Sequence, residues 1–402
     1  MQLTTNHAYW LHQNGIIRTY PRLRNDAEAD VVVLGAGITG AMVAQRLAKE
    51  GHRVLVIDKR DVACGSTSAS TALLQYEIDV SLVDLSKKIG PDRASEAYRI
   101  SHASIDRLET LANSLGNPCD FRRATSLYFA DSRSAALSLA KEYRARSELG
   151  LDVTYHDQLS TRQHFLLEGC ACLSSQQAAS CDPYRLTHAL LWDAQGRGAQ
   201  IYDRTEIVDA RPDGSELVLV SKDNVSIRCR WMVVATGYES VKWLPEKILN
   251  LDNTYAIITE PLEDGELGGW NPNWMLWEAK DPYLYLRMTS DRRLLIGGED
   301  ERFHSATRRQ SQLAQKSQAL EKKGRKLLPF VSFCTDYCWA GTFGKTRDGL
   351  AYIDRHPQHP QILFALGFGG NGITFSQIAT DILAAELASA PLPYQSLFAF
   401  HR

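Results

Sequence analysis

VVVLGAGITGAMVAQRLAKEGHRVLVIDK, residues 31–59, is the stretch of this 402-residue chain that decides its fold. Residues 31–34 and 54–57 are apolar and indicate two buried strands, and residues 41–50 have the amphipathic pattern of a helix that ends at Gly51. Gly35, Gly37 and Gly40 stand between the first strand and the helix in the pattern G-x-G-x-x-G. This order predicts a β-α-β unit that binds a dinucleotide.

Each glycine of the pattern has a physical role in such a unit. Gly35 allows a tight turn, Gly37 lets a pyrophosphate approach the backbone, and Gly40 lets the helix pack closely on the strand. The helix N-terminus, at Ile38 and Thr39, offers amide donors and the positive end of a dipole to the phosphates.

The second strand ends at Asp58, followed by Lys59. The spacing between Gly35 and Asp58 suits an aspartate that accepts a hydrogen bond from a ribose hydroxyl. We therefore expect Asp58 and Lys59 to belong to the dinucleotide-binding site. The alternative, a glycine-rich turn that binds nothing, leaves the third glycine and the acid unexplained.

The overall composition is typical of a globular protein and argues against nucleic-acid-binding and membrane proteins. Hydrophobic residues make up 44% and charged residues 23%, with 45 Lys+Arg against 47 Asp+Glu, which is ordinary for a globular chain of about two domains. The absence of a basic block argues against nucleic acid, and the absence of a long apolar run argues against an integral membrane segment. The N-terminus does not resemble a secretory signal, so we expect a cytoplasmic protein. The eight cysteines are scattered and predict no metal site.

A hydroxyl-rich stretch follows the second strand. Residues 64–79 contain Gly65 and a group of side-chain hydroxyls. A solvated loop would have the same composition, but its position at the carboxyl end of the strands favours contact with a ligand. The hydroxyls belong to Ser66, Thr67, Ser68, Ser70 and Thr71.

The rest of the chain alternates between helical and strand-like patterns. Residues 80–150 predict helices around a strand at 121–130, residues 184–195 predict a helix, and residues 254–302 predict several strands before a helix at 305–328. Between them, strands are expected at 216–221, 225–229 and 232–234. The last of these ends in a small-residue turn, Ala235, Thr236 and Gly237.

A second glycine turn lies near the C-terminus. An apolar strand at 362–366 meets four glycines, and a helix follows to about residue 388. The helix N-terminus is again suited to an anion. The glycines are Gly367, Gly369, Gly370 and Gly372.

These motifs, in this order, resemble the D-amino-acid oxidase (DAO) superfamily of FAD-dependent oxidoreductases over nearly the whole chain. The resemblance also includes the strand Leu294-Leu-Ile-Gly-Gly-Glu299. Tyr9-Trp10 and Trp339-Ala-Gly-Thr further resemble its amine and γ-glutamylputrescine oxidoreductase-like branch.

The resemblance implies an α/β fold in which a Rossmann-like FAD-binding domain is interleaved with a smaller antiparallel-sheet (α+β) substrate domain. The FAD-binding domain would comprise residues 1–80, 155–245 and 335–402. The substrate domain would comprise residues 81–154 and 246–334, with its sheet covering the flavin.

The resemblance also implies roles for the motifs. The first glycine turn and Asp58 would hold the ADP half, residues 66–71 would line the pyrophosphate and flavin, and the backbone of Ile207 would contact the adenine side. Residues 369–373, which include Asn371 and Ile373, would face the isoalloxazine edge.

The sequence departs from the family at three points. Members that act on free amino acids place an arginine within the segment that matches 339–354, where this chain has Phe343, Gly344 and then Lys345. Sarcosine-oxidase-like members carry a lysine near the position of Leu295, and attach FAD to a cysteine near residues 339–340. Cys338 is adjacent but not aligned, so we expect non-covalent FAD.

The expected reaction is hydride transfer from a C–H bond beside an amine nitrogen to flavin N5, giving an imine that water hydrolyses. No acid–base triad is needed. Candidate catalytic residues are Tyr285, Arg287, Gln75 and Lys345, although strand tyrosines and charged residues also occur for structural reasons.

Three alternatives stay open: a hydroxyl substrate such as a glycerol-3-phosphate-like polyol, a non-catalytic flavin-binding module, and an NAD-dependent dehydrogenase, against which the second glycine turn argues. The expected partners are a small-molecule substrate and oxygen or another electron acceptor. The sequence does not identify the substrate.

Overall fold

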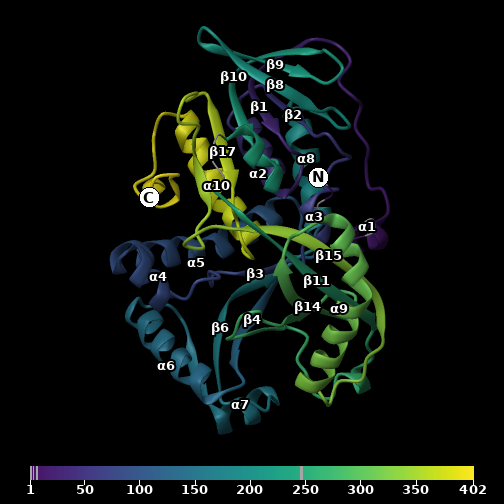
Figure 1. The fold of residues 1–402 in the computed structure, drawn as a ribbon, viewed down its shortest axis with the longest axis vertical. Coiled ribbons are helices and arrows are strands. Elements are labelled where there is room, and N and C mark those ends of the chain that lie inside the picture. Colours follow the sequence, from purple (N-terminus) through teal and green to yellow (C-terminus); the bar gives the residue numbers. More distant parts are fainter. Residues whose placement is uncertain (1, 3, 6–7, 245–247) are drawn as a thin grey trace.

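The computed structural model describes residues 2, 4–5, 8–244 and 248–402, so residues 1, 3 and 6–7 of the expected N-terminal arm lie outside it. Two large sheets, one of eight and one of nine strands, occupy the two halves of the elongated molecule in Figure 1. The first sheet has the expected β-α-β unit at its centre, and the second is mostly antiparallel. This arrangement is the α/β class that the sequence predicted.

The first sheet has the order β16-β17-β10-β1-β2-β7, with the β8–β9 hairpin attached to β10. Its central strands are parallel, and Val31 of β1 pairs with Val54 of β2. Their bounds are β1 Ala27–Leu34, β2 Val54–Ile57, β7 Gln200–Tyr202, β8 Ile207–Asp213, β9 Glu216–Ser221, β10 Ser226–Val234, β16 Tyr352–Arg355 and β17 Ile362–Leu366.

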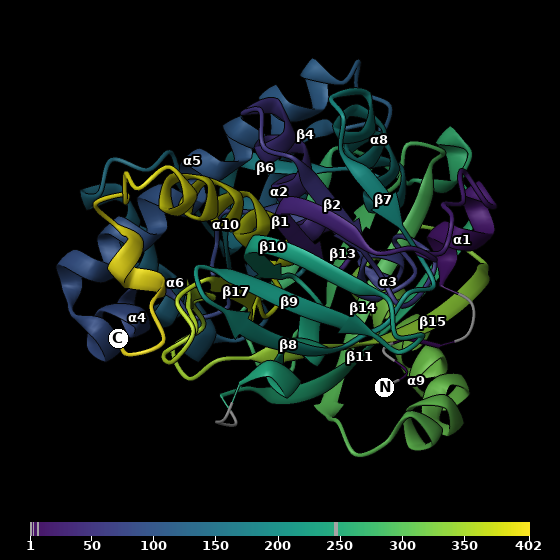
Figure 2. The same cartoon turned by 90° about the horizontal axis from the view of Figure 1, so that it is seen from above.

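Three helices cover one face of this sheet, and the β8–β9 hairpin lies over the other, as Figure 2 shows. The helices are α2 (Ile38–Lys49), α8 (Pro183–Gly196) and α10 (Gly372–Leu387). Because both faces are covered, Val31 to Leu34 and Val54 to Ile57 are buried without alternation, which explains their continuous apolar sequence.

The second sheet has the order β15-β11-β14-β13-β12-β4-β6-β3, with β5 paired to β6. All its pairs are antiparallel except β4 with β12. The strands are β3 Leu73–Gln75, β4 Arg122–Ala130, β5 Thr154–Asp157, β6 Ala171–Ser180, β11 Asn250–Pro261, β12 Trp274–Glu278, β13 Tyr285–Met288, β14 Arg293–Arg302 and β15 Thr335–Lys345.

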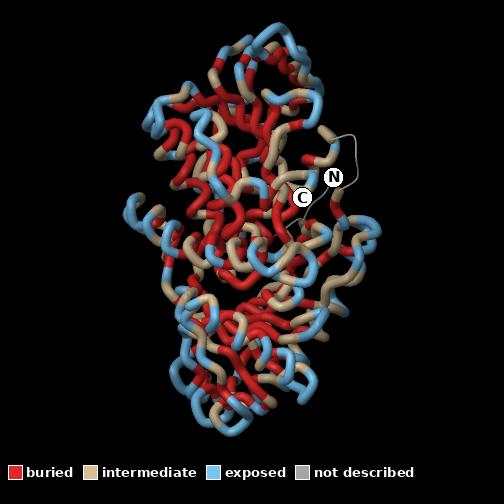
Figure 3. The backbone as a smooth tube through the Cα atoms, turned by 90° about the vertical axis from the view of Figure 1, so that its left-hand side faces the viewer, coloured by how far each residue is buried: buried red, intermediate tan, exposed pale blue. Residues whose placement is uncertain are grey.

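The remaining helices pack around these sheets. Helix α9 (Ala306–Leu327) covers β11, β14 and β15, while α5 (Pro91–Ser114) packs against α10. Figure 3 shows buried backbone in both halves of the molecule and exposed segments mainly at its periphery. The others are α1 Tyr9–Asn14, α3 Ser66–Ala69, α4 Leu82–Ile89, α6 Arg133–Glu148, α7 Gln158–Phe165, and the short 3₁₀ helices η1 Gly237–Trp243, η2 Asp264–Glu266 and η3 Gln395–Phe398.

Two local predictions are wrong. Strands expected at 225–229 and 232–234 form the single strand β10, because β1 pairs with it on both sides of Arg230, at Cys229 and at Trp231. The hydroxyl-rich stretch is not an open loop throughout, because Ser66–Ala69 form one helical turn.

The proposed domain boundaries stay a prediction. The second sheet takes β3, β6, β15 and all of β5 except Thr154 from segments that we assigned to the FAD-binding domain. Helix α5, from a segment assigned to the substrate domain, packs on α10 instead.

Candidate active site

One large cleft runs from the carboxyl ends of β1 and β2 to the second sheet. It encloses about 1860 Å³ of space not filled by atoms, including its opening to solvent. Its lining extends from the start of α2 and the end of β2 to β13 of the second sheet, so the cleft suits an elongated molecule. It brings together the first glycine turn, the hydroxyl-rich stretch, the 235–237 turn, the second glycine turn and β13.

The first glycine turn is shaped by close backbone approach. Gly35 has a φ of +105°, and a methyl group there would overlap the carbonyl oxygen of Ala235 at the end of β10. A methyl group at Gly40 would overlap the carbonyl oxygen of Gly35. Both glycines are therefore required by the fold itself, and Gly40 does not line the cleft.

Gly37 and the start of α2 face the cleft. The first hydrogen bond within α2 runs from Ala41 N to Gly37 O, so the earlier amides have no partner inside the helix. One of them, Ile38 N, donates to Thr67 Oγ1 at 2.9 Å. The hydroxyl-rich stretch thus lies against the N-terminus of α2, where an anion is expected to bind.

Asp58 organises the backbone around it. Its Oδ2 accepts from Ala36 N and its Oδ1 from Arg60 N, both at 2.8 Å. Burial raises the pKa of Asp58, while these two amides oppose that shift. A carboxylate oxygen has two lone pairs, so each oxygen retains one for a ribose hydroxyl.

A charged group lies next to Asp58 that the sequence analysis did not identify. Glu239 of η1 contacts Lys59 Nζ at 2.7 Å and Arg60 Nη1 at 2.9 Å. Lys242 donates to the Ile207 carbonyl at 3.3 Å, so this backbone group, expected on the adenine side, already has a partner. Nothing in the sequence near Lys59 indicates this contact, because Glu239 is 180 residues further along the chain.

The hydroxyl-rich stretch is fixed from behind by three large side chains. Trp10 Nε1 donates to Ser70 O at 2.7 Å, and Trp339 Nε1 donates to Ala69 O at 2.9 Å. Arg287 Nε donates to Thr71 O at 2.7 Å. Because these bonds hold one side of the hydroxyl-rich stretch, its other side faces the cleft.

The second glycine turn closes the other side of the cleft. Gly369 N donates to Gly344 O at 3.0 Å, and Gly370 N donates to Asp79 Oδ2 at 2.8 Å. Burial raises the pKa of Asp79. Asn371 does not line the cleft, because its Nδ2 donates to Glu77 O at 2.8 Å.

Tyrosines and an aspartate line the end of the cleft formed by the second sheet. Tyr285 lies against Gly297, where any side chain would overlap its ring, and its hydroxyl is 3.2 Å from Thr254 Oγ1. Tyr283 lies beside it, with ring centroids 5.7 Å apart. Asp300 completes this end, and the sequence analysis did not identify it.

Two of the predicted catalytic residues do not line the cleft. Lys345 contacts Asp252 Oδ2 at 2.9 Å, and although burial opposes its charge, this contact raises the pKa of Lys345. Arg287 is 2% exposed and lines a second cavity behind the hydroxyl-rich stretch. Tyr285 and Gln75, by contrast, both line the cleft.

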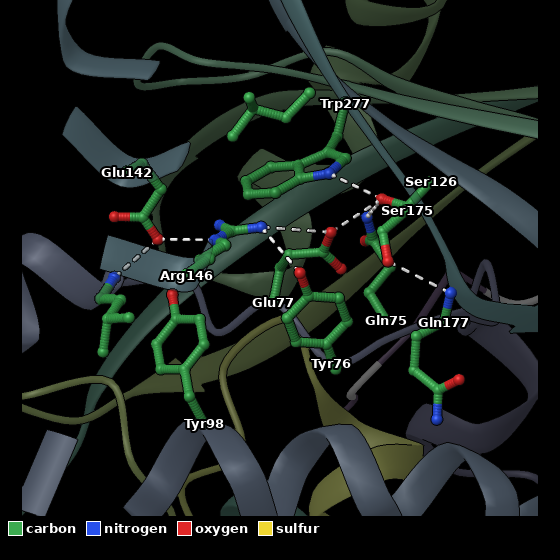
Figure 4. A network of polar contacts seen from close by, with 12 residues as sticks. Gln75, Tyr76, Glu77, Tyr98, Ser126, Glu142, Arg146, Ser175, Gln177 and Trp277 are labelled. Atoms are coloured by element: carbon green, nitrogen blue, oxygen red, sulfur yellow. Dashed lines mark hydrogen bonds and ion pairs between the residues drawn. The ribbon is translucent and has the colours of Figure 1, made fainter. Parts of the chain in front are cut away.

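Gln75 is tied to a buried polar network (Figure 4). Its Nε2 donates to Ser126 Oγ at 3.3 Å, and Ser126 Oγ donates to Glu77 Oε1 at 3.1 Å. Arg146 then joins two buried acids, with Nη1 3.4 Å from Glu77 Oε1 and Nε 2.8 Å from Glu142 Oε1. This network fixes the segment that carries Gln75.

Most of the predicted cofactor residues meet in the cleft, and Gly40, Ser68 and Asn371 do not line it. Those that do are Gly35, Gly37, Ile38, Thr39, Asp58, Lys59, Ser66, Thr67, Ser70, Thr71, Ile207, Ala235, Thr236, Gly237, Gly367, Gly369, Gly370, Gly372 and Ile373.

The residues present fit FAD. Ser66 Oγ is buried beside the cleft without a hydrogen-bond partner among the described residues, which suits a ligand acceptor such as a phosphate oxygen. The cleft is also long enough to join a nucleotide end to the tyrosines, as a dinucleotide requires.

Comparisons with known proteins agree with this geometry. The sequence model of the family described as "FAD dependent oxidoreductase" (DAO) matches residues 30–386. A Rieske 2Fe-2S iron-sulfur protein of Bacillus subtilis, YhfW, is 22% identical over 97% of this chain and 74% of its own. Glycine oxidase of Bacillus licheniformis is 24% identical over 92% of this chain and 96% of its own. The crystal structure of glycine oxidase from Geobacillus kaustophilus aligns with a TM-score of 0.78 at 21% identity, covering 93% of this chain and 99% of that one.

Among the described residues, no helix is both long enough and apolar enough to cross a membrane. The same residues contain no cluster of three or more histidine, cysteine or acidic side chains placed to bind a metal.

Proposed function

Because this chain belongs to the DAO family of FAD-dependent oxidoreductases, we propose that it oxidises a C–N bond of an amine or amino-acid-like substrate. The predicted family and the predicted cofactor, FAD, are confirmed by the match over residues 30–386. The names of the glycine oxidases among its relatives support an amine nitrogen in the substrate.

One observation carries the proposal: a single cleft joins the dinucleotide-type turns to a polar, aromatic end on the second sheet. Tyr283, Tyr285, Thr254 and Gln75 supply that end. Apolar walls with a few placed polar groups are typical of a substrate pocket. A flavin-binding module without catalytic activity does not need such an end of the cleft.

FAD supplies a hydride acceptor for the C–H bond beside the amine nitrogen, and water then hydrolyses the imine. The residues of this chain position the substrate for that step. The Tyr285 hydroxyl and the Gln75 amide offer hydrogen bonds at the cleft wall, and the rings of Tyr283 and Tyr285 limit how the substrate lies. Precise positioning of this kind can supply several kcal/mol of the barrier reduction, on the order of 7–11 kcal/mol in ideal cases.

We further propose that FAD is held non-covalently, because none of the described residues that line the cleft is a cysteine. The roles of the individual cofactor residues, a cytoplasmic location and the identity of the electron acceptor, oxygen or another carrier, stay predictions.

Anaerobic titration tests the proposed function. The purified protein should be yellow, and its flavin absorption near 450 nm should bleach when an amine or amino acid substrate is added without oxygen. A holoprotein that no amine bleaches, or that only a polyol phosphate bleaches, would refute the proposal. A protein that cannot take up FAD would refute it as well.

A further inference from the structure

Asp300 enters the cleft because of a bulge in β14. Asn253 of β11 pairs with Glu301, but Tyr255 pairs with Gly298, so Glu299 and Asp300 together face Thr254. Glu299 has a φ of +59° at this point. A bulge re-aims the side chains of a strand, and this one places Asp300 on the cleft side.

The α9 side of β14 confirms the change of direction. Ile296 faces Gly324 of α9, and strict alternation from Ile296 would put Asp300 on that same side. Instead, Glu299 and Glu301 both reach Lys316 of α9, at 3.3 and 4.0 Å. The extra residue therefore turns Asp300 away from the helix.

The Asp300 carboxylate lacks a cationic partner. Its Oδ1 is buried and has no hydrogen-bond partner among the described residues, and no ion pair within that part of the chain includes Asp300. Lys345, the cation that influences it, is paired with Asp252 at 2.9 Å. A buried acceptor without a partner is costly, so a ligand donor here would be strongly favoured.

The charge at this end of the cleft is negative. Among the described residues that line the cleft, the cations are Lys59, Arg60 and Lys242, and all three lie at the end formed by β2 and η1. Asp79, whose Oδ1 is 3.5 Å from the Tyr283 hydroxyl, adds a second carboxyl group near the tyrosines.

We propose that Asp300 binds the ammonium group of the substrate, and that the substrate is a cationic amine without a carboxylate. This inference rests on the proposed function and narrows its substrate class. An ammonium ion would satisfy Oδ1 by a charge-assisted hydrogen bond, and the faces of Tyr283 and Tyr285 would attract the same positive charge.

An amino acid or a polyol phosphate fits this end less well. Its carboxylate or phosphate would lie beside Asp300 and two tyrosines, with Asp79 next to the Tyr283 hydroxyl and no arginine or lysine of the described cleft lining at that end. Two like charges that are close and partly desolvated repel each other, which separates the two substrate classes.

Two ligands that cannot be oxidised test the proposal by binding alone. tert-Butylammonium has no C–H bond beside its nitrogen, and 2-aminoisobutyrate is the same skeleton with one methyl replaced by a carboxylate. Isothermal titration calorimetry and the shift of the flavin spectrum, both with the FAD-loaded protein at pH 8, should show that tert-butylammonium binds more tightly. Equal or tighter binding of 2-aminoisobutyrate would overturn the proposal, and this comparison needs no variant.

Substitution of Asp300 tests the residue. Asp300→Asn should weaken tert-butylammonium binding about 10- to 100-fold, since a charge-assisted bond is lost. Asp264→Asn is the matched control, because Asp264 is 92% exposed and lies outside the cleft. Unchanged affinity in a folded, FAD-loaded Asp300→Asn protein would contradict the assignment.

The outcomes separate this inference from the proposed function. If amino acids bleach the flavin and bind independently of Asp300, amine oxidation stands and the inference fails. If tert-butylammonium binds through Asp300 but no amine bleaches the flavin, the binding assignment stands and the proposed function fails.

Discussion

Arg287 donates a hydrogen bond from Nε to the carbonyl of Thr71 across 2.7 Å, and so ties β13 to the hydroxyl-rich stretch beside the cleft. The same guanidinium donates to Cys181 O and Met288 O, both at 3.1 Å. Burial lowers the pKa of Arg287 to about 10, which leaves it charged at neutral pH. Because Arg287 does not line the cleft, we propose that it positions the hydroxyl-rich stretch and does not contact the substrate.

Replacement of Arg287 should therefore weaken FAD binding and stability together. Arg287→Leu leaves three carbonyls without their charged donor, and we expect a loss of about 2–4 kcal/mol in the free energy of unfolding. Urea denaturation and fluorimetric titration with FAD measure the two effects. Arg162→Leu is the control, because Arg162 is an exposed arginine that pairs with an equally exposed acid, Glu168. Weaker substrate binding with unchanged FAD affinity would contradict this role.

Gly35→Ala should destabilise the protein even without FAD. The new methyl group would overlap the Ala235 carbonyl, and the residue would keep a φ of +105°. Two causes contribute at Gly35, the backbone strain of a positive φ and the steric overlap with Ala235. Gly51→Ala measures the strain alone, since Gly51 has a φ of +90° but open space around it. We expect about 1 kcal/mol of destabilisation at Gly51 and at least twice as much at Gly35, measured by thermal unfolding of both apoproteins. Equal losses would show that the contact with Ala235 is unimportant.

Arg146 should be essential to the buried network of Figure 4. Arg146→Met leaves Glu77 and Glu142 buried without their shared cation, and we expect a loss of about 3–5 kcal/mol, measured by urea denaturation. Arg144→Met, on the exposed side of the same helix, is the control and should cost less than about 0.5 kcal/mol. A loss no larger than that at Arg144 would contradict the stabilising role of the Arg146 ion pairs.

Binding of an ammonium ligand should depend on pH near 6. Burial raises the pKa of Asp300 to about 6, with Asp79 and Asp252 acting in the same direction and Thr254 and Lys345 opposing them. The carboxylate is charged above this pKa and neutral below it, so the affinity for tert-butylammonium should be full near pH 8 and about tenfold lower at pH 5. Alkylammonium ions stay charged throughout this range. Calorimetry across pH 5–8 should show this fall in the unmodified protein and its loss in Asp300→Asn.

Much of the cofactor side of the cleft could be predicted from local sequence. Gly35, Asp58 and the second glycine turn are recognisable because a dinucleotide site is built from contiguous strand–turn–helix units. Residues that reach the site from distant parts of the chain, such as Glu239 beside Lys59, belong to no short sequence motif and could not be recognised in this way. The position of Arg287 outside the cleft could not be predicted for a related reason: the alternation of residues on β13 indicates which face of the sheet Arg287 occupies, but not that the backbone of Thr71 lies against that face.

The sequence by itself determined that this chain has a dinucleotide-binding β-α-β unit, a second glycine turn and the FAD family to which they belong, because these depend on short-range spacing and backbone sterics. The tertiary structure alone decided which side chains form the substrate end of the cleft. Asp300 lies there because a bulge between β11 and β14 shifts the strand by one residue and reverses the face that its side chain takes. Alternation counted along the sequence places it under α9, on the opposite side of the sheet.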